Sequence, residues 1–250
     1  MKTKIIIATS MMLAQPSLSN ESLIISSIDW CPQLCNKDSQ RGYVMDIVDA
    51  IFKGSPYTLE VQSFPWTRAI RLVENGRSHA LLAPTREEAP NLKFPEQEIG
   101  LQRMCFFTKS SSEWAYTGED SLKGLTIGLA QDTYIDELSE YIEKNEKQFD
   151  YIPYNDGYLA SSFKKLKFNR IDTFVFTYNS TRYEINRNNL KFDYKEAGCF
   201  TENKIYMAFS PSDKNKNEID DMLSYFDIKM VSLKRSGEIN KIMSNYGLND

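Results

Sequence analysis

The chain has 250 residues, of which 41% are hydrophobic and 26% charged, and its formal net charge is -4 at pH 7. This length is enough for one large or two modest domains with buried cores, and the composition is ordinary for a soluble globular protein. The negative net charge excludes the broad basic surface that nucleic-acid binding requires, so we expect no nucleic-acid partner.

The first residues have the pattern of an export signal. Lys2 and Lys4 form a short positive region, an apolar run covers residues 5–14, and small serines at either end of the segment 17–19 precede a cleavage site. The apolar run is too short to cross a bilayer, which takes about 20 residues. We therefore predict that residues 1–19 are a signal peptide and that the mature protein is periplasmic. The alternative is a buried strand of a cytosolic protein.

The cysteines fit an oxidising compartment. Cys31 and Cys35 lie close together in the sequence, and Cys105 and Cys199 lie far apart. Because export favours pairing, we predict a Cys31–Cys35 disulfide, and the Cys105–Cys199 disulfide then follows by elimination. Metal binding is the competing use, but Cys-x-x-x-Cys with the single His79 elsewhere is a poor zinc set. We expect no metal and no cofactor.

Segments typical of strands and of helices alternate along the chain, as in an α/β protein. In the first half, short apolar runs predict strands at 23–28, 59–61 and 80–83, and apolar residues at helical spacing predict helices at 45–52 and 67–74.

The second half continues in the same style. Apolar runs predict strands at 125–130, 173–176 and 205–209. Apolar stripes at helical spacing predict helices that contain Ile135, Leu159, Ile219 and Ile239.

Two serine-rich segments are candidate domain boundaries. They are residues 110–112 and, with a proline, residues 210–212. If the chain crosses between domains near both, residues 110–205 form an inserted second lobe. The first lobe then consists of residues 20–109 and 206–250.

Several short motifs follow one another across nearly the whole chain. They are Asp29-Trp30-Cys31-Pro32, Gly42-Tyr43, Phe-Pro-Trp-Thr-Arg-Ala at 64–69, Leu122-Lys123-Gly124-Leu125 and Leu-Lys-Arg-Ser-Gly-Glu at 233–238. In this order they resemble family 3 of the bacterial extracellular solute-binding proteins, the amino-acid-binding kind associated with ABC transporters. The resemblance implies a type II periplasmic-binding-protein fold, with two α/β lobes joined by two hinge crossings. It also implies a monomer without catalysis that holds a small-molecule ligand in the cleft and meets a membrane permease.

Two tryptophans occupy positions where the family places aromatic residues against the ligand. Trp30 falls at the first and Trp66 at the second. A flat indole offers a large apolar area and a cation–π face at little entropic cost. The alternative for both residues is a place in the hydrophobic core.

The first-lobe polar residues depart from the family pattern. Thr85 matches a hydroxyl that contacts the ligand's anionic group, but the arginine expected three residues later is Glu88 here. Arg86 either replaces that arginine from a different angle or is a surface charge. Arg68 is the other candidate cation, and its alternative is a solvated helix face.

The second-lobe residues are altered as well. Asp132 and Thr133 lie at the strand-to-helix turn where the family binds a carboxylate, although helix capping explains the pair equally. The acid that usually binds the ligand's ammonium group is Thr177 here. Since burying an unpaired charge costs several kcal/mol, we predict a ligand with one charge or none, such as a small polar metabolite or a modified amino acid.

The sequence leaves two alternatives to solute binding. An exported hydrolase needs a catalytic base, and the only histidine is His79, whose position favours a turn or rim residue. The sequence has no Gly-x-Ser-x-Gly elbow, no His-Glu-x-x-His pair and no phosphate-binding glycine loop, so we expect no enzyme. The second alternative is a ligand-sensing envelope protein, which has the same lobes and signals to a separate membrane partner.

Overall fold

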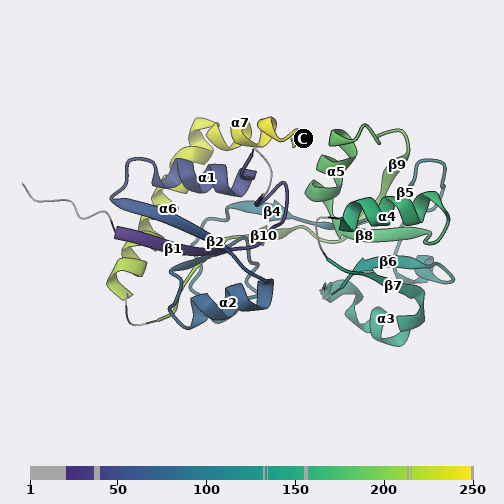
Figure 1. Cartoon of the computed structure of the whole chain (residues 1–250), viewed down its shortest axis with the longest axis horizontal. Coiled ribbons are helices and arrows are strands. Elements are labelled where there is room, and N and C mark those ends of the chain that lie inside the picture. The colour runs from purple at the N-terminus through teal and green to yellow at the C-terminus, as the bar shows by residue number, and fades with distance from the viewer. Residues whose placement is uncertain are drawn as a thin grey trace, which may run out of the picture.

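The computed structural model describes most of the chain, namely residues 21–36, 40–131, 133, 135–154, 157–212, 214 and 216–248. The predicted signal peptide lies outside the described residues. The described chain forms two lobes that lie side by side and are joined near the centre of the molecule (Figure 1).

The first lobe is built on a four-stranded sheet in the order β11-β3-β1-β2. Its strands are β1 (Glu21–Ser27), β2 (Tyr57–Ser63), β3 (Ala80–Leu82) and β11 (Met207–Phe209). β1 pairs in parallel with β2 and β3, and β11 pairs antiparallel to β3.

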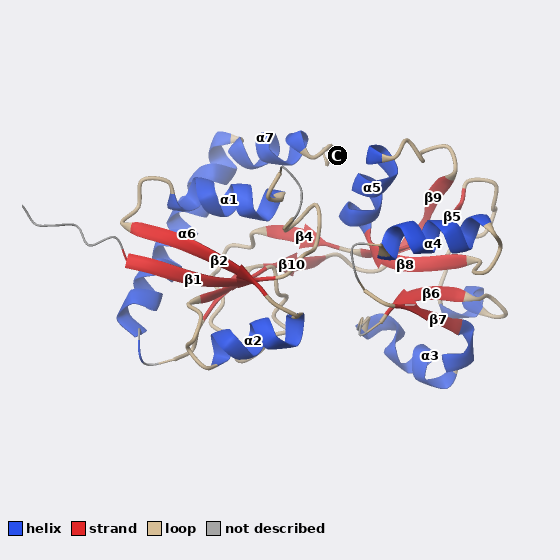
Figure 2. Ribbon diagram, in the orientation of Figure 1, coloured by secondary structure: helices blue, strands red, loops and turns tan. Residues whose placement is uncertain are grey.

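Four helices cover the two faces of this sheet. They are α1 (Tyr43–Phe52), α2 (Trp66–Glu74), α6 (Lys216–Ser236) and α7 (Glu238–Asn245). Because side chains alternate along a strand, Leu82 packs into the core under α1 and α6, while Leu81 packs against Ala69 and Val73 of α2. Figure 2 shows helices on both sides of the strands in each lobe.

The second lobe has a five-stranded sheet in the order β7-β6-β8-β5-β9. Its strands are β5 (Met104–Lys109), β6 (Ile127–Ala130), β7 (Phe149–Ile152), β8 (Thr173–Thr177) and β9 (Tyr194–Cys199). Its helices are α3 (Ser139–Lys144), α4 (Tyr158–Lys167) and α5 (Tyr178–Arg187), with short 3-10 turns η1 (Glu119–Leu122), η2 (Asp136–Leu138) and η3 (Glu146–Gln148). Phe174 and Val175 are fully buried in different clusters, so both faces of this sheet are covered.

Two short strands connect the lobes. β4 (Gly100–Gln102) and β10 (Asn203–Ile205) pair antiparallel, with Gly100 opposite Ile205 and Gln102 opposite Asn203. The chain thus passes between the lobes twice, and the two passages run side by side (Figure 1). This is the predicted α/β architecture of two lobes with two hinge crossings.

The first crossing differs from the boundary predicted at residue 110. β5 ends at Lys109, yet it pairs with β8 and β9 of the second sheet, so residues 104–109 belong to the second lobe and not to the first. The serines that suggested a linker form a turn after β5, where the Ser112 amide donates to the carbonyl of Lys109 at 2.9 Å. Serine favours tight turns as much as linkers, which explains the difference.

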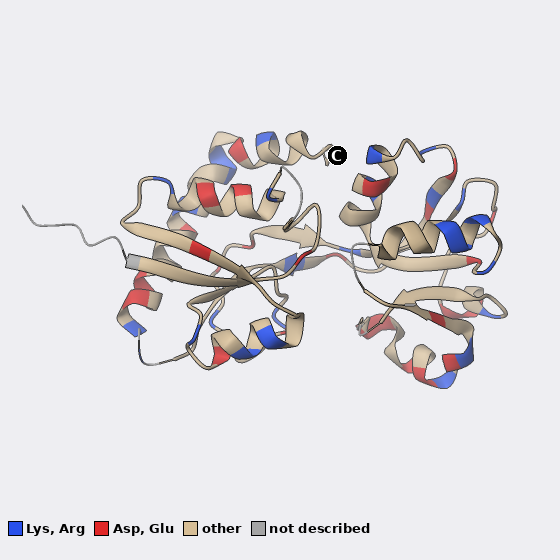
Figure 3. Cartoon of the chain, viewed as in Figure 1, with Lys and Arg blue, Asp and Glu red and all other residues tan. Residues whose placement is uncertain are grey.

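Both predicted disulfides are confirmed. Cys31 and Cys35 are bonded in the loop that follows β1, and Cys105 and Cys199 are bonded across β5 and β9, where they are direct partners. Basic and acidic residues are interspersed along both lobes (Figure 3). None of the helices in the described part of the chain combines the length and the apolar character that a membrane span requires.

Candidate functional site

Trp30 and Thr177, which the sequence places far apart, meet between the lobes. The indole Nε1–H of Trp30 donates to Oγ1 of Thr177 at 3.3 Å, and this hydrogen bond is buried. Trp30 packs against the first-lobe core and is 8% exposed, and Thr177 ends β8 directly before α5. The Trp30 indole therefore packs in the first-lobe core and also contacts the second lobe.

Trp30 lies in a loop that we call the bridged loop (residues 29–36 and 40–42), because the Cys31–Cys35 disulfide closes it. Next to the disulfide, the backbones of Trp30 and Leu34 exchange hydrogen bonds of 2.6 and 2.9 Å. Gly42 has φ +99°, and a Cβ there would lie 2.3 Å from the carbonyl oxygen of Gln33. Only glycine permits this close return of the chain.

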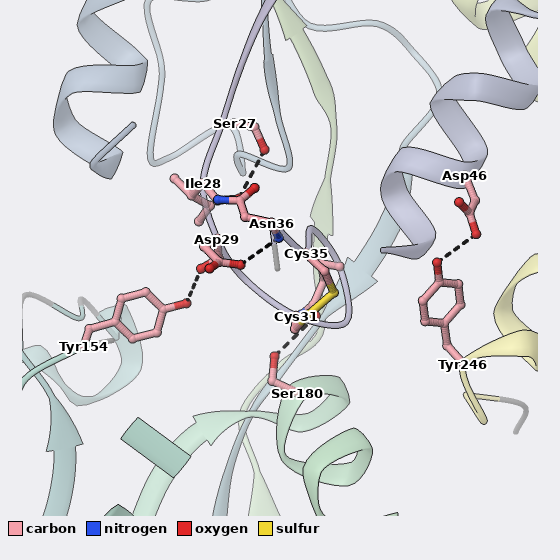
Figure 4. The surroundings of a disulfide bond; sticks show 11 residues. Ser27, Ile28, Asp29, Cys31, Cys35, Asn36, Asp46, Tyr154, Ser180 and Tyr246 are labelled. Carbon is pink, nitrogen blue, oxygen red and sulfur yellow. Dashed lines mark hydrogen bonds between the residues drawn. A yellow bond between two sulfur atoms is a disulfide. The ribbon is translucent and has the colours of Figure 1, made fainter. Parts of the chain in front are cut away.

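A tyrosine of the second lobe also contacts the bridged loop. Figure 4 shows Tyr154 reaching from the second lobe to Asp29, whose carbonyl accepts a hydrogen bond from the tyrosine hydroxyl at 3.0 Å. The opposite face of Asp29 is occupied too, because its carboxylate accepts the amide N–H of Asn36 at 3.1 Å.

The first turn of α5 supplies two further contacts. The hydroxyl of Ser180 donates to the side-chain oxygen of Gln33 at 3.3 Å, and Ser180 points toward the disulfide in Figure 4. The amide of Asn179 donates to the hydroxyl of Tyr43, the first residue of α1, also at 3.3 Å.

All four of these interlobe hydrogen bonds join uncharged groups. Burial raises the pKa of Tyr43 to about 12, more than the Asn179 hydrogen bond lowers it, so its phenol is protonated at neutral pH. The salt bridges between described residues lie within a lobe or, for Glu98 and Lys204, at a crossing. Among the described residues, the four hydrogen bonds between the lobes are therefore polar and neutral.

The structure gives Thr85 and Arg86 partners within the first lobe. Thr85 and Glu88 exchange hydrogen bonds between side chain and backbone, at 2.9 and 3.2 Å, in the manner of a capping box. The Arg86 guanidinium lies 4.7 Å from the centre of the Tyr206 ring and donates to the carbonyl of Pro95 at 2.9 Å. These contacts explain both residues structurally, and their role in ligand binding stays a prediction.

Trp66 and Arg68 lie at the start of α2. Trp66 is half-buried and packs on the cluster formed by α2 and its neighbours, including Ala69. Arg68 is exposed, with its guanidinium 5.1 Å from the centre of the Phe64 ring. These contacts lie within the first lobe, and the role of both residues in ligand binding stays a prediction.

The predicted strand-to-helix turn of the second lobe is described only in part. Thr133 is half-buried, and its amide donates to the carbonyl of Ala130 at the end of β6, at 3.2 Å. Asp132 lies outside the described residues. The role of both residues in ligand binding stays a prediction.

His79 has a structural role. Its Nδ1 accepts the backbone N–H of Ile24 at 3.0 Å, which extends the pairing of β1 and β3. In the described part of the chain, the one cluster of metal-binding residue types is Cys105, Cys199 and Glu196, and its two sulfur atoms are bonded to each other. These sulfurs offer no thiolate to a metal.

An open groove of about 410 Å³ lies at the rim of the interlobe contact, between α5 and the end of α7. Both lobes line it with amide, phenol and guanidinium groups, which belong to Gln40, Tyr183, Asn186, Arg187, Asn245 and Tyr246. The residues of the four interlobe hydrogen bonds do not line this groove.

Sequence reasoning missed most of the residues that join the lobes. They are Asp29, Gln33, Tyr43, Tyr154, Asn179 and Ser180. Common polar residue types in unremarkable patterns carry no signal of their own, and their partners are at least 125 positions away in the sequence. The resemblance marked only Trp30 and Thr177.

No protein-family model matches the sequence, and no curated protein matches it. Solved structures do match. A substrate-binding protein of an ABC uptake transporter from Streptococcus pneumoniae, with bound histidine, has a TM-score of 0.70 at 17% identity, covering 93% of this chain and 95% of that chain. The GluR0 ligand-binding core from Nostoc punctiforme, in complex with L-glutamate, has a TM-score of 0.69 at 12% identity, covering 91% and 100%.

A third similar structure belongs to a signalling protein. It is a histidine kinase sensor domain described as similar to periplasmic binding proteins, with a TM-score of 0.68 at 17% identity, covering 91% of this chain and 96% of that chain. At such identities the likeness concerns the fold. The chain has the two-lobed α/β fold of the type II periplasmic binding proteins.

Proposed function

We propose that the protein is an exported, non-catalytic solute-binding protein that captures a small polar ligand between its lobes and delivers it to the permease of an ABC transporter. The observation that carries this proposal is the buried hydrogen bond between Trp30 of one lobe and Thr177 of the other. A ligand that takes the place of this hydrogen bond and contacts both residues does so only while the lobes are together, so its binding energy favours that arrangement.

The ligand we propose carries one charge or none. The interlobe groups near Trp30 are a hydroxyl, an amide, a phenol and backbone carbonyls, all of them neutral. Arg86, the nearest substitute for the family's arginine, already stacks on Tyr206 and donates to Pro95. A zwitterionic amino acid would bury two charges, each of which costs several kcal/mol without a partner.

The second candidate function is ligand sensing in the cell envelope. It is favoured by the similarity to a histidine kinase sensor domain. The two roles require the same binding step and differ in the membrane partner. Permease and ATPase genes beside the coding gene support delivery, and a sensor kinase gene beside it supports signalling.

Native mass spectrometry of the purified protein tests the binding step. We expect a retained small molecule whose mass is unchanged after prolonged incubation. A thermal-shift screen of neutral and singly charged metabolites follows, because a ligand at about 100 times its Kd adds roughly 2.7 kcal/mol of stability. Turnover of a compound by the pure protein, or tight binding of an unmodified zwitterionic amino acid, contradicts the corresponding part of the proposal.

A further inference from the structure

Two short segments provide most of the groups in the hydrogen bonds between the lobes. On the first lobe, the bridged loop and Tyr43 provide all the groups that take part in the four interlobe hydrogen bonds. On the second lobe, three of the four partners are Thr177, Asn179 and Ser180, at the start of α5. These bonds join protein to protein directly.

The bridged loop is held in one shape by several independent constraints. Besides the disulfide and the Trp30–Leu34 backbone pairing, the amide of Tyr43 donates to Pro32 at 2.9 Å and that of Cys35 donates to Arg41 at 2.9 Å. A preordered surface loses little conformational entropy when it meets a partner. The loop therefore presents its polar groups to the second lobe at little cost.

The start of α5 is ordered as well. The Thr181 hydroxyl donates to the carbonyl of Thr177 at 2.9 Å, and the amide of Tyr178 donates to the carbonyl of Arg103 at 2.9 Å. The guanidinium of Arg103 lies 4.1 Å from the centre of the Tyr178 ring. Arg103 follows β4, so this turn of helix is tied to the crossing itself.

We propose that the bridged loop and the start of α5 form a latch that keeps the lobes together in the absence of ligand, with Gln33, Asn179 and Ser180 as its positioning residues. Gln33 and Ser180 are buried in this contact, 1% and 2% exposed. Separation of the lobes returns their polar groups to water, so the hydrogen bonds set the closed fraction without dominating overall stability. The latch lies at the site of the proposed function. Only its role in ligand capture rests on that function.

A latch of this kind changes how a ligand is captured. If the ligand-free protein is mostly closed, a ligand enters only during rare openings. The apparent Kd then rises in proportion to the scarcity of the open form, unless contacts made by the ligand offset this rise. Once bound, the ligand leaves slowly for the same reason. The proposed role is therefore long retention of the ligand.

Single-molecule FRET on the ligand-free protein tests the latch, with dyes at the exposed positions Lys53 in the first lobe and Lys147 in the second. Native mass spectrometry first establishes that no small molecule is bound. We expect a mostly closed wild type, and about a tenfold lower closed-to-open ratio when Asn179→Ala and Ser180→Ala are combined. Ser180→Ala alone is the milder variant if the double one folds poorly.

The matched controls are Ser139→Ala and Asn188→Ala, whose side chains hydrogen-bond within the second lobe, to Asp136 and Glu184. They should leave the ratio unchanged. A ligand-free wild type that is mostly open, or a closed fraction equal in the wild type and the latch variants, overturns the latch. Because no ligand is added, this result is independent of whether the protein binds a solute at all.

Discussion

The two disulfides have different effects in the two regions of the molecule that they join. Cys105 and Cys199 are 94 positions apart and join β5 to β9, directly beyond the crossings. Cys31 and Cys35 are 4 positions apart and close the bridged loop, which faces the second lobe. A long closed loop restricts the unfolded chain strongly and a short one weakly. The first bond thus serves the stability of the fold, and the second shapes a contact surface.

Removal of the long-range disulfide gives the largest effect. For Cys105→Ala with Cys199→Ala, the chain-entropy relation predicts a loss of about 4.7 kcal/mol in the free energy of unfolding. Urea denaturation followed by circular dichroism measures this loss. We expect the closed fraction of the folded protein to stay the same. If the free energy of unfolding falls by no more than it does without the short disulfide, the two regions do not differ in the way proposed.

Removal of the short disulfide tests whether this bond shapes the contact surface. For Cys31→Ala with Cys35→Ala, the same relation predicts a loss of only about 2 kcal/mol in the free energy of unfolding. Here we expect the closed-to-open ratio of the ligand-free protein to fall, because the bridged loop loses its fixed shape. Single-molecule FRET on this variant and on the long-range variant separates the two roles. An unchanged ratio here would mean that the remaining constraints suffice.

Thr177→Val isolates the central hydrogen bond at the latch. Valine keeps the size of the side chain but leaves the Trp30 indole N–H without its acceptor, which costs about 1 kcal/mol in the closed form. We expect the closed-to-open ratio to drop about fivefold. Thr108→Val is the control, because its hydroxyl bonds to Asp172 within the second lobe. A similar drop of the closed-to-open ratio in the control would show that the ratio responds to any lost hydrogen bond in the second lobe and not to this one in particular.

The smallest effect concerns the first-lobe end of the crossings, where ion pairs replace a disulfide. Partial burial raises the pKa of Glu98, but the Lys234 hydrogen bond and the Lys204 ammonium outweigh it, and the pKa lies below its usual 4.5. The ion pairs therefore stabilise the fold above about pH 4.5, and this stabilisation is lost as the pH falls through the lowered pKa. At neutral pH we expect Glu98→Gln to cost less than about 1 kcal/mol.

Urea denaturation at pH 7 and at pH 3 checks this prediction. The difference between wild type and Glu98→Gln should shrink at the lower pH. Glu238→Gln is the matched control, since its partner Lys241 is on the protein surface. A difference that persists at pH 3 would assign the effect of Glu98 to packing rather than to charge.

Much of the fold was predictable from local patterns, because buried strands and amphipathic helices leave a periodic signal. The runs at 23–28 and 173–176 correspond to β1 and β8, and the apolar spacing at 45–52 corresponds to α1. α5 was not predicted. Its sequence is rich in tyrosine, asparagine, serine and threonine, which are mediocre helix formers, and Ile185 is its only buried aliphatic residue. Tertiary packing determines this helix.

The candidate site was predictable only where a resemblance marked it. Trp30 and Thr177 were named on that ground, and the structure brings them together. Gln33 and Ser180 lie 147 positions apart, and nothing local in either segment indicates the other. Arg86 shows the opposite difficulty, since its charge suggested a ligand contact and the fold gives it Tyr206 and Pro95 as partners.

The pairing of β4 with β10 has a mechanical consequence. Two separate tethers would let one lobe twist and swing independently about each of them. Because β4 and β10 are paired, the two tethers behave as a single ribbon. A ribbon bends more easily across its thin direction than in its own plane, so we expect the relative motion of the lobes to be mainly a rotation about one axis. The bridged loop and α5 then return to the same register each time they meet.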